Sequence, residues 1–477
     1  MKQTTKFATA FALSLLLVSP VYASTSSSST SIESSSSYTI DTRFLPRRMQ
    51  NETVQFMNPN ERQFPTIEIT TTGEGEPFAI RDLWITANIT VDGVADSGSI
   101  RGRGNTSWFS FPDKRPLRLR FDSHRQMFDS PATHRDWILL ALQSDPSLMR
   151  NFALKSLSEG LPGIYWSPFT HFVHLYVNDE YMGVYMLTDE RNVTPGRAVL
   201  VADSDPSVSE FFLELDWRLY RQNRRERSNS YEWEDFVRVN AAGIINDSHS
   251  NNSYGGRFYR DFLYEVLFPG SSIRTLAHME YVQEFMTHVH TSIRNQDWQE
   301  FSSLVYMPSF VDFYLIHEIF KNVDTGASSQ FMQIKNVYIP EHGYSRRLVM
   351  GPVWDFDLTS GNNIGRIESP YDLYATLRHV WWHYLMDMPE FFELVSERFN
   401  TYAFDATQNT IAEINRIANT YTTDFEHNFT RHEILGTDIW PGRTPYAIQN
   451  ETTFLGQVDI LTDFLYRRIN WLNDFLN

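Results

Sequence analysis

Two aspartates separated by one aromatic residue are the side chains of this sequence best suited to chemistry. Asp355 and Asp357 flank Phe356 in a stretch that begins Gly-Pro-Val-Trp. Residues i and i+2 of a strand point to the same face, so a strand here would aim both carboxylates at one point. The turn that follows carries Asn362, whose amide oxygen would join a set of ligands suited to Mg²⁺ or Ca²⁺. The alternative is a turn after a strand, in which the Asp side chains bond only local backbone.

A glycine-containing loop and a cationic strand lie far upstream of this pair. Residues 101–108 contain two glycines, which would let the backbone approach an anion. Residues 117–121 alternate apolar side chains with Arg118 and Arg120, which predicts a strand with one apolar and one cationic face. Gly-x-Gly alone is a weak signal. An RNA-binding Arg-Gly segment does not fit, because the motif does not repeat.

A third carboxylate precedes the aspartate pair by one predicted hairpin. Residues 308–321 show helical apolar spacing and run directly into Asp324. Residues 332–339 and 346–350 then predict a hairpin that leads to Asp355. Phosphoryl transfer needs backbone and cations around the phosphates, a carboxylate for the acceptor hydroxyl and a carboxylate for the metal. The order of these parts therefore indicates phosphoryl transfer.

Charge and motif content argue against several other classes. The formal net charge of −17 disfavours nucleic acid and anionic membranes, which both reward Lys and Arg. The absence of cysteine removes thiol catalysis and thiolate zinc sites. His-Glu pairs at His317 and His432 begin like the His-Glu-x-x-His zinc motif, but both lack the second histidine.

Composition divides the chain into four predicted parts. Residues 1–23 have a basic start, a short apolar run and small residues before a cleavage site, which predicts a signal peptide and a secreted or cell-surface protein. Residues 24–60 predict a Ser-rich disordered linker, 61–435 the main domain and 436–477 a C-terminal helical extension packed on it. No later run approaches the ~20 apolar residues that span a membrane.

Local patterns predict the remaining elements. Asp145 as cap and Pro146 at the first helical position predict the start of a helix. The polar, Gly- and Asn-rich residues 218–270 predict a long variable insertion. Strands are predicted at 66–70, 84–91 and 210–216, a hairpin at 171–187, and helices at 282–293 and 458–472.

Taken in order, these segments resemble the CotH kinase family, named for a spore-coat protein. Any one segment would be weak, but the ordered set covers roughly residues 65–435 and is specific. The matching segments are residues 101–108, 114–121, 137–140, 148–151, 183–190, 212–216, 317–324 and 351–357.

The resemblance implies an α+β fold of an atypical protein-kinase type with two lobes, an antiparallel N-lobe sheet and a mainly helical C-lobe. It implies ATP and Mg²⁺ or Mn²⁺ as cofactors. It suggests Asp324 as the catalytic carboxylate, and Asp357 with Asp355 and Asn362 as the metal site. The ATP-binding residues that it suggests are Arg103, Asn105, Ser107, Lys114, Arg120 and Glu190, with Glu190 paired to Lys114 or Arg120.

Two positions depart from the pattern of ordinary protein kinases. Ser329 stands five residues after Asp324, where the catalytic loop would carry Asn. Arg120 stands where a strand lysine is expected, and Arg is not interchangeable with Lys at a phosphate. The identity of the phosphate-binding cation therefore stays open.

Two other classes also stay open. A carbohydrate-active hydrolase would suit an acidic, secreted chain rich in Trp and Tyr, but carboxylates two residues apart lie too close to flank a sugar. A non-catalytic surface protein on the same scaffold is the other alternative, and metal and nucleotide binding would decide it. For a kinase, the expected partner is a protein with Ser/Thr acceptors, among which the Ser-rich residues 24–37 of the chain itself are a candidate.

Overall fold

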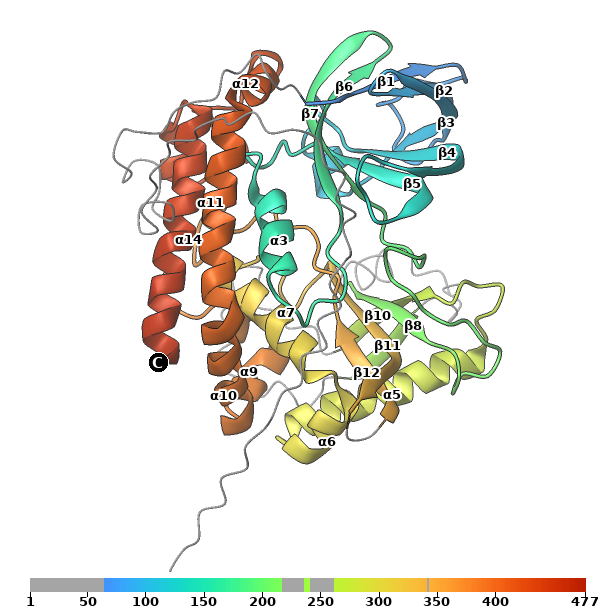
Figure 1. The fold of residues 1–477 in the computed structure, drawn as a ribbon, viewed down its shortest axis with the longest axis vertical. Coiled ribbons are helices and arrows are strands. Elements are labelled where there is room, and N and C mark those ends of the chain that lie inside the picture. Colours follow the sequence, from blue (N-terminus) through green and yellow to red (C-terminus); the bar gives the residue numbers. More distant parts are fainter. Residues whose placement is uncertain (1–63, 217–235, 241–260, 341–342) are drawn as a thin grey trace, which may run out of the picture. The chain divides into compact units, whose positions relative to one another are not determined.

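The computed structural model describes residues 64–216, 236–240, 261–340 and 343–477. This part of the chain is α+β, with a strand-rich N-terminal part and a helix-rich C-terminal part (Figure 1). None of its helices is both long and apolar enough to cross a bilayer.

Seven N-terminal strands close into a barrel in the order β1-β2-β3-β4-β5-β7-β6. Neighbours are antiparallel except β1 and β6, which run parallel and close the ring with Thr66 opposite His174. The strands are β1 (Thr66–Thr71), β2 (Ile85–Val91), β3 (Val94–Gly102), β4 (Leu117–Gln126), β5 (Thr133–Leu140), β6 (Thr170–Val177) and β7 (Glu180–Asp189).

Side-chain alternation along β4 gives the barrel its inside and its outside. Leu119 and Phe121 are buried in the barrel core with Trp137, while Arg118 and Arg120 point outward. The sequence predicted this strand and its two faces correctly. The prediction of an antiparallel N-terminal sheet is wrong in two respects. Strands β1 and β6 pair in parallel, and the sheet closes into a barrel. Closure leaves the barrel without open edges.

A second sheet has the strand order β12-β11-β8-β10-β9. Two of its strands come from residues 218–270, the predicted insertion, so the described parts of that segment extend the sheet. The strands are β8 (Phe211–Leu215), β9 (Phe236–Asn240), β10 (Asp261–Phe268), β11 (Gln330–Ile339) and β12 (Gly343–Met350). The predicted hairpin of β11 and β12 is confirmed, with Met332 opposite Met350.

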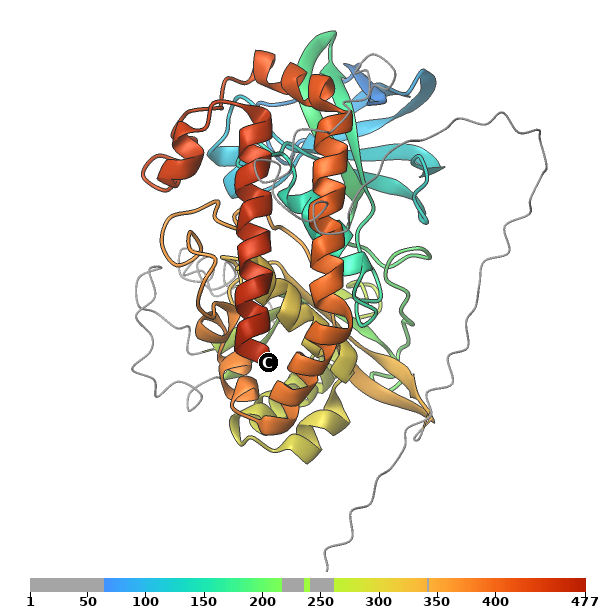
Figure 2. The ribbon, with the colours of Figure 1, turned by 60° about the vertical axis from the view of Figure 1, so that its left-hand side comes forward.

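Helix α7 (Met307–Phe320) lies at the centre of the largest hydrophobic cluster. It is mostly apolar and is buried continuously from Ser309 to Phe320, as expected for a helix with no solvent face. Helices α11 and α14 run side by side in both views (Figures 1 and 2). The other helices are α5 (Leu276–Arg294), α6 (Trp298–Leu304), α8 (Ala375–Arg378), α9 (Val380–Met386), α10 (Pro389–Arg398), the π-helical η3 (Phe399–Ala403), α11 (Phe404–Thr420), α12 (Thr422–Arg431), α13 (Tyr446–Asn450) and α14 (Phe454–Leu476).

Two short helices occur among the N-terminal strands in sequence, α2 (Thr106–Phe109) and α3 (Arg150–Glu159), of which α3 packs against α11 and α7. Helix α3 begins at Arg150, not at Pro146 as predicted. Leu148 has a left-handed backbone with φ of 56°, which interrupts any helix begun before it. Asp145 still acts on the helix start, because its carboxylate accepts a hydrogen bond from the Arg150 backbone N–H at 2.8 Å.

Candidate functional site

The turn that follows α7 connects Asp324 to the aspartate pair through Ser329. Asp324 begins this turn, and its carbonyl accepts hydrogen bonds from the backbone N–H groups of Ala327 at 2.8 Å and Ser328 at 3.2 Å. The next residue, Ser329, donates its hydroxyl to Asp355 Oδ2 at 3.2 Å. The residue that replaces the expected catalytic-loop Asn therefore contacts one of the predicted metal ligands.

The stretch around the aspartate pair is not a strand, so the predicted reason for a shared orientation is wrong. Asp355 is exposed and has a left-handed backbone with φ of 68°, a strained state for a residue other than glycine. Phe356 points the other way, into the core, with its ring 5.1 Å from that of His317 and 5.5 Å from that of Phe320. Burial of Phe356 fixes the segment while Asp355 reaches solvent.

Asp357 is held by hydrogen bonds that come from both sides. It accepts one from the Ser144 hydroxyl and one from the Leu358 backbone N–H at 3.0 Å. The Asn362 amide nitrogen donates to the carbonyls of Ser144 and Asp357, each at 2.7 Å. Asn362 thus keeps its amide oxygen as the atom that could face a cation.

The electrostatics of the aspartate pair fit a hard cation. Burial and the neighbouring Asp355 raise the pKa of Asp357 to about 7, although Ser144 acts against this. Asp355 raises this pKa because a second negative carboxylate disfavours ionisation of the first, and a divalent ion would remove this repulsion. Among the described residues no three His, Cys, Asp or Glu side chains converge as a metal site. Mg²⁺ commonly takes only one or two carboxylates and fills its shell with water and phosphate oxygens.

An unpaired guanidinium lies on the Asp355 side of the site. Arg103 is half-buried and lies over the Trp354 ring at 5.9 Å, next to Arg191, which lies over the same ring at 5.1 Å. Burial and Arg191 lower the pKa of Arg103 to about 10, while Glu190 and Asp355 oppose this. Within the described chain the Arg103 guanidinium makes no hydrogen bond or ion pair. It is therefore available to an anion.

Glu190 pairs with a different arginine from either predicted partner. Arg118 contacts it at 3.2 Å, whereas Arg120 bonds Asp136 at 2.7 Å. Burial would raise the pKa of Glu190, but Arg191, Arg118 and Arg103 lower it below its usual value. Glu190 is thus a charged carboxylate among Arg103, Arg118 and Arg191, which form an arginine cluster.

Lys114, the other predicted partner of Glu190, is fully buried among different residues. Its ammonium donates to the Val184 carbonyl at 2.8 Å and to Asn428 Oδ1 at 2.6 Å. Burial lowers its pKa well below the usual value. These contacts join β7 to α12 and are a complete structural role for the lysine.

The remaining predicted residues lie on the loop after β3. Gly104 has φ of 83°, and a Cβ there would lie 2.3 Å from the Ser107 hydroxyl, so this turn requires glycine. Asn105 is exposed, and its carbonyl accepts from Trp108 at 3.1 Å at the start of α2. Within the described residues, neither Asn105 nor Ser107 forms a hydrogen bond or ion pair with the aspartate pair, so the structure places them on the loop only.

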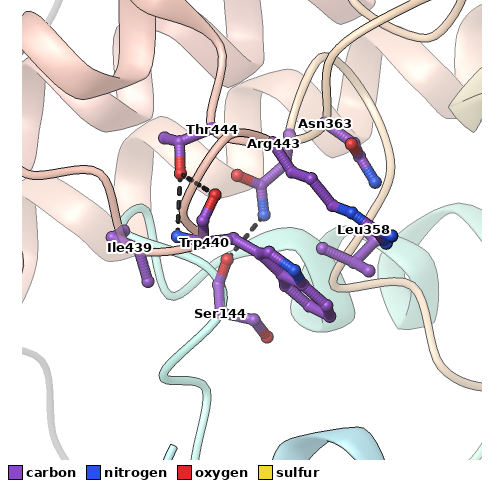
Figure 3. Close-up of a pocket in the computed structure, with 8 residues that line it drawn as sticks. Ser144, Leu358, Asn363, Ile439, Trp440, Arg443 and Thr444 are labelled. Carbon is purple, nitrogen blue, oxygen red and sulfur yellow. Dashed lines mark hydrogen bonds between the residues drawn. The ribbon is translucent and has the colours of Figure 1, made fainter. Parts of the chain in front are cut away.

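Sequence reasoning missed a pocket beside Asp357 that a distant loop completes. Its walls come from the Ser144 turn, the Leu358–Asn363 region and a loop just before α13, and Figure 3 shows them converging. The only sequence signal for this loop was an aromatic and a cation around a Pro-Gly turn. The lining residues are Ser144, Leu358, Asn362, Asn363, Ile439, Trp440, Arg443 and Thr444.

The fold and this site define an α+β protein with a carboxylate pair beside an arginine cluster. Residues 100–472 match the family model described as CotH kinase protein. The chain therefore belongs to the CotH kinase family and is an atypical kinase-like protein. A comparison with curated proteins gives no match.

Proposed function

We propose that the protein is a secreted kinase that transfers the terminal phosphate of ATP to Ser/Thr hydroxyls of proteins, with Mg²⁺ or Mn²⁺. The observation that carries the proposal is the hydrogen bond from Ser329 to Asp355. It ties the turn that begins at Asp324 to the candidate metal-binding segment. A carboxylate for the acceptor and carboxylates for the metal are the two groups that phosphoryl transfer requires.

Each group has a distinct part in the proposed reaction. Asp324 accepts the proton of the acceptor hydroxyl as its oxygen forms a bond to the terminal phosphorus. The bond from that phosphorus to the bridging oxygen breaks, and ADP leaves with the electron pair. Asp355 and Asp357, with Asn362, would hold the metal, which neutralises charge on the phosphate oxygens when bound. Arg103 supplies a guanidinium that forms no ion pair within the described chain, so it can bind a phosphate.

Nucleotide-dependent melting tests the proposal. ATP at ~100 times its Kd should stabilise the protein by about 2.7 kcal/mol in the presence of Mg²⁺, and by far less with EDTA. The matched control is Asp355→Asn, which should melt like the wild type alone but lose the shift. Overlapping curves with and without ATP and metal would exclude the kinase and leave a binding protein on this scaffold.

A further inference from the structure

The loop that completes the pocket beside Asp357 is internally braced. The Trp440 backbone N–H donates to the Thr444 hydroxyl at 2.9 Å, and the Trp440 carbonyl accepts from the Arg443 N–H at 2.7 Å. Asp438 accepts from the Gly442 N–H at 2.9 Å. These bonds span the Pro-Gly turn, so the loop presents Trp440 and Arg443 in a fixed arrangement.

The same loop is attached to two parts of the candidate site. The Arg443 carbonyl accepts a hydrogen bond at 3.0 Å from the Ile364 N–H, at the turn that carries Asn362. The Trp440 ring meets the Phe111 ring edge-on at 5.7 Å, on the segment between α2 and β4. The loop thus bridges the segment between α2 and β4 and the Asn362 turn.

No carboxylate of the described residues pairs with the Arg443 guanidinium. It lies 5.7 Å from the Trp440 ring centre, is exposed, and makes no hydrogen bond or ion pair within the described residues. Figure 3 shows its side chain extending across the pocket toward Leu358 and Asn363. By contrast Arg118 and Arg120 pair with Asp136 at 3.2 and 2.7 Å.

Two unpaired guanidiniums therefore flank the aspartate pair from opposite ends of the chain. Arg103 lies 5.9 Å from the ring centre of Trp354, the residue before Asp355. Arg443 shares a pocket with Ser144 and Leu358, the two residues that hydrogen-bond Asp357. An extended polyphosphate bound to a metal at the pair would meet one guanidinium on each side.

The apolar surroundings distinguish the two ends. On the Asp355 side, next to Arg103, lies a mainly apolar pocket lined by Leu140, Met186 and Trp354, which suits the base of a nucleotide. The Arg443 pocket is small and mixes the polar side chains of Ser144 and Thr444 with apolar ones. A nucleotide whose base occupies the apolar pocket would direct its inner phosphates to Arg103 and its outermost phosphate to Arg443.

We propose that Arg443 binds the terminal phosphate of the nucleotide, with Trp440 holding its guanidinium in place. This inference rests on the proposed function. A planar guanidinium can donate two parallel hydrogen bonds to phosphate oxygens, which an ammonium cannot do. Arg443 is thus the residue that distinguishes a nucleoside triphosphate from a diphosphate.

Nucleotide affinities of Arg443→Ala test this assignment. With Mg²⁺, its affinity for a non-hydrolysable ATP analogue should fall roughly 10- to 100-fold, the usual effect of losing a charged hydrogen bond, while ADP affinity stays unchanged. Arg443→Lys should recover part of the loss. Arg416→Ala, at an exposed arginine that pairs with Glu413 on α11, is the matched control and should bind both nucleotides like the wild type.

The possible results separate the inference from the function beneath it. An Arg443→Ala protein that binds the ATP analogue normally, or loses ATP and ADP affinity equally, overturns the assignment while the kinase proposal stands. A wild-type protein that binds neither nucleotide overturns both.

Discussion

Ser144 donates a hydrogen bond to the Asp357 carboxylate across 213 positions of sequence. Ser144 follows β5 and Asp357 follows β12, so this contact connects the barrel with the segment that the second sheet delivers. It fixes one carboxylate of the candidate metal site without supplying a positive charge. Asp357 therefore remains a carboxylate whose ionisation depends on its surroundings.

Metal binding should depend on pH near neutrality. Burial and Asp355 raise the pKa of Asp357 from 3.8 to about 7, so below pH 7 a cation must displace a proton. Metal affinity, measured by calorimetry, should rise by up to roughly tenfold per pH unit up to pH 7 and level off above it. Asp357→Asn should flatten this profile. A profile that is equally steep in the mutant would assign the titration to another group.

The stability of the metal-free protein should respond to the same group in the opposite sense. The folded state holds the Asp357 proton more tightly than the unfolded chain, because its pKa is raised from 3.8 to about 7. Its contribution to stability is therefore complete below pH 4 and is lost as pH rises through 7. Saturating metal should reduce this loss in urea titrations at pH 5, 6 and 8.

Asp324 and Asp355 should fail in different ways when changed to Asn. Asp324→Asn should keep ATP affinity and lose ~10²–10⁴-fold in kcat, because a positioned proton acceptor acts in the transition state. Asp355→Asn should lose metal-dependent ATP affinity. If each aspartate were only a turn residue, each change would lower the free energy of unfolding by ~1 kcal/mol and leave phosphoryl transfer intact. Full transfer activity in Asp324→Asn would remove its assigned role.

Ser329 should support the metal site and not the fold. Ser329→Ala removes a single hydrogen bond to Asp355, which should weaken metal-dependent ATP binding by roughly fivefold, or about 1 kcal/mol. The melting temperature without ligand should change little. The neighbouring Ser328→Ala is the control. Equal losses in both variants would show a general disturbance of the turn.

Substitutions of Lys114 should affect the stability of the fold, whereas substitutions of Arg103 should affect ATP binding. Lys114→Met removes the side-chain donor to the Val184 carbonyl and one of the two donors to Asn428 Oδ1, so it should lower the unfolding free energy by roughly 1–3 kcal/mol. ATP affinity of the folded protein should persist. Arg103→Leu should do the reverse, with normal melting and weaker ATP binding. If folded Lys114→Met lost nucleotide binding, Lys114 would have to be assigned as a phosphate-binding residue.

The Ser-rich residues 24–37, which lie outside the described residues, should be phosphorylated by the protein itself. They offer many hydroxyls, and Glu33 places an acid near an acceptor. Mass spectrometry after incubation with ATP and metal should find phosphate there in the wild type and none in Asp324→Asn. A protein phosphorylated elsewhere but not between 24 and 37 would contradict this prediction.

Local periodicity was enough to predict the elements that carry the site. The alternation around Arg118, the apolar face of α7 and the β11–β12 hairpin all depend on residues a few positions apart. These elements predicted that Asp324 follows α7 and that the aspartate pair follows the β11–β12 hairpin. The backbone at Asp355 did not, because its left-handed state depends on burial of Phe356 beside it.

Pairing between distant residues could not be predicted in the same way. Glu190 has several arginines within reach, and only the geometry of the barrel selects Arg118 over Arg120. Lys114 looks like a phosphate-binding cation until α12 supplies Asn428 as its acceptor. Trp440 and Arg443 reach the site through tertiary packing that no short motif encodes.

The parallel pairing of β1 with β6 sets an order on folding. Thr66 of β1 can pair with His174 of β6 only after His174 leaves the ribosome, about 5–20 s later at ordinary rates of synthesis. The Phe64 backbone N–H then bonds Asp424 on α12, a partner made near the end of translation. Strand β1 therefore completes its pairing in the barrel late. Its unpaired edge in the nascent chain is where a chaperone would act.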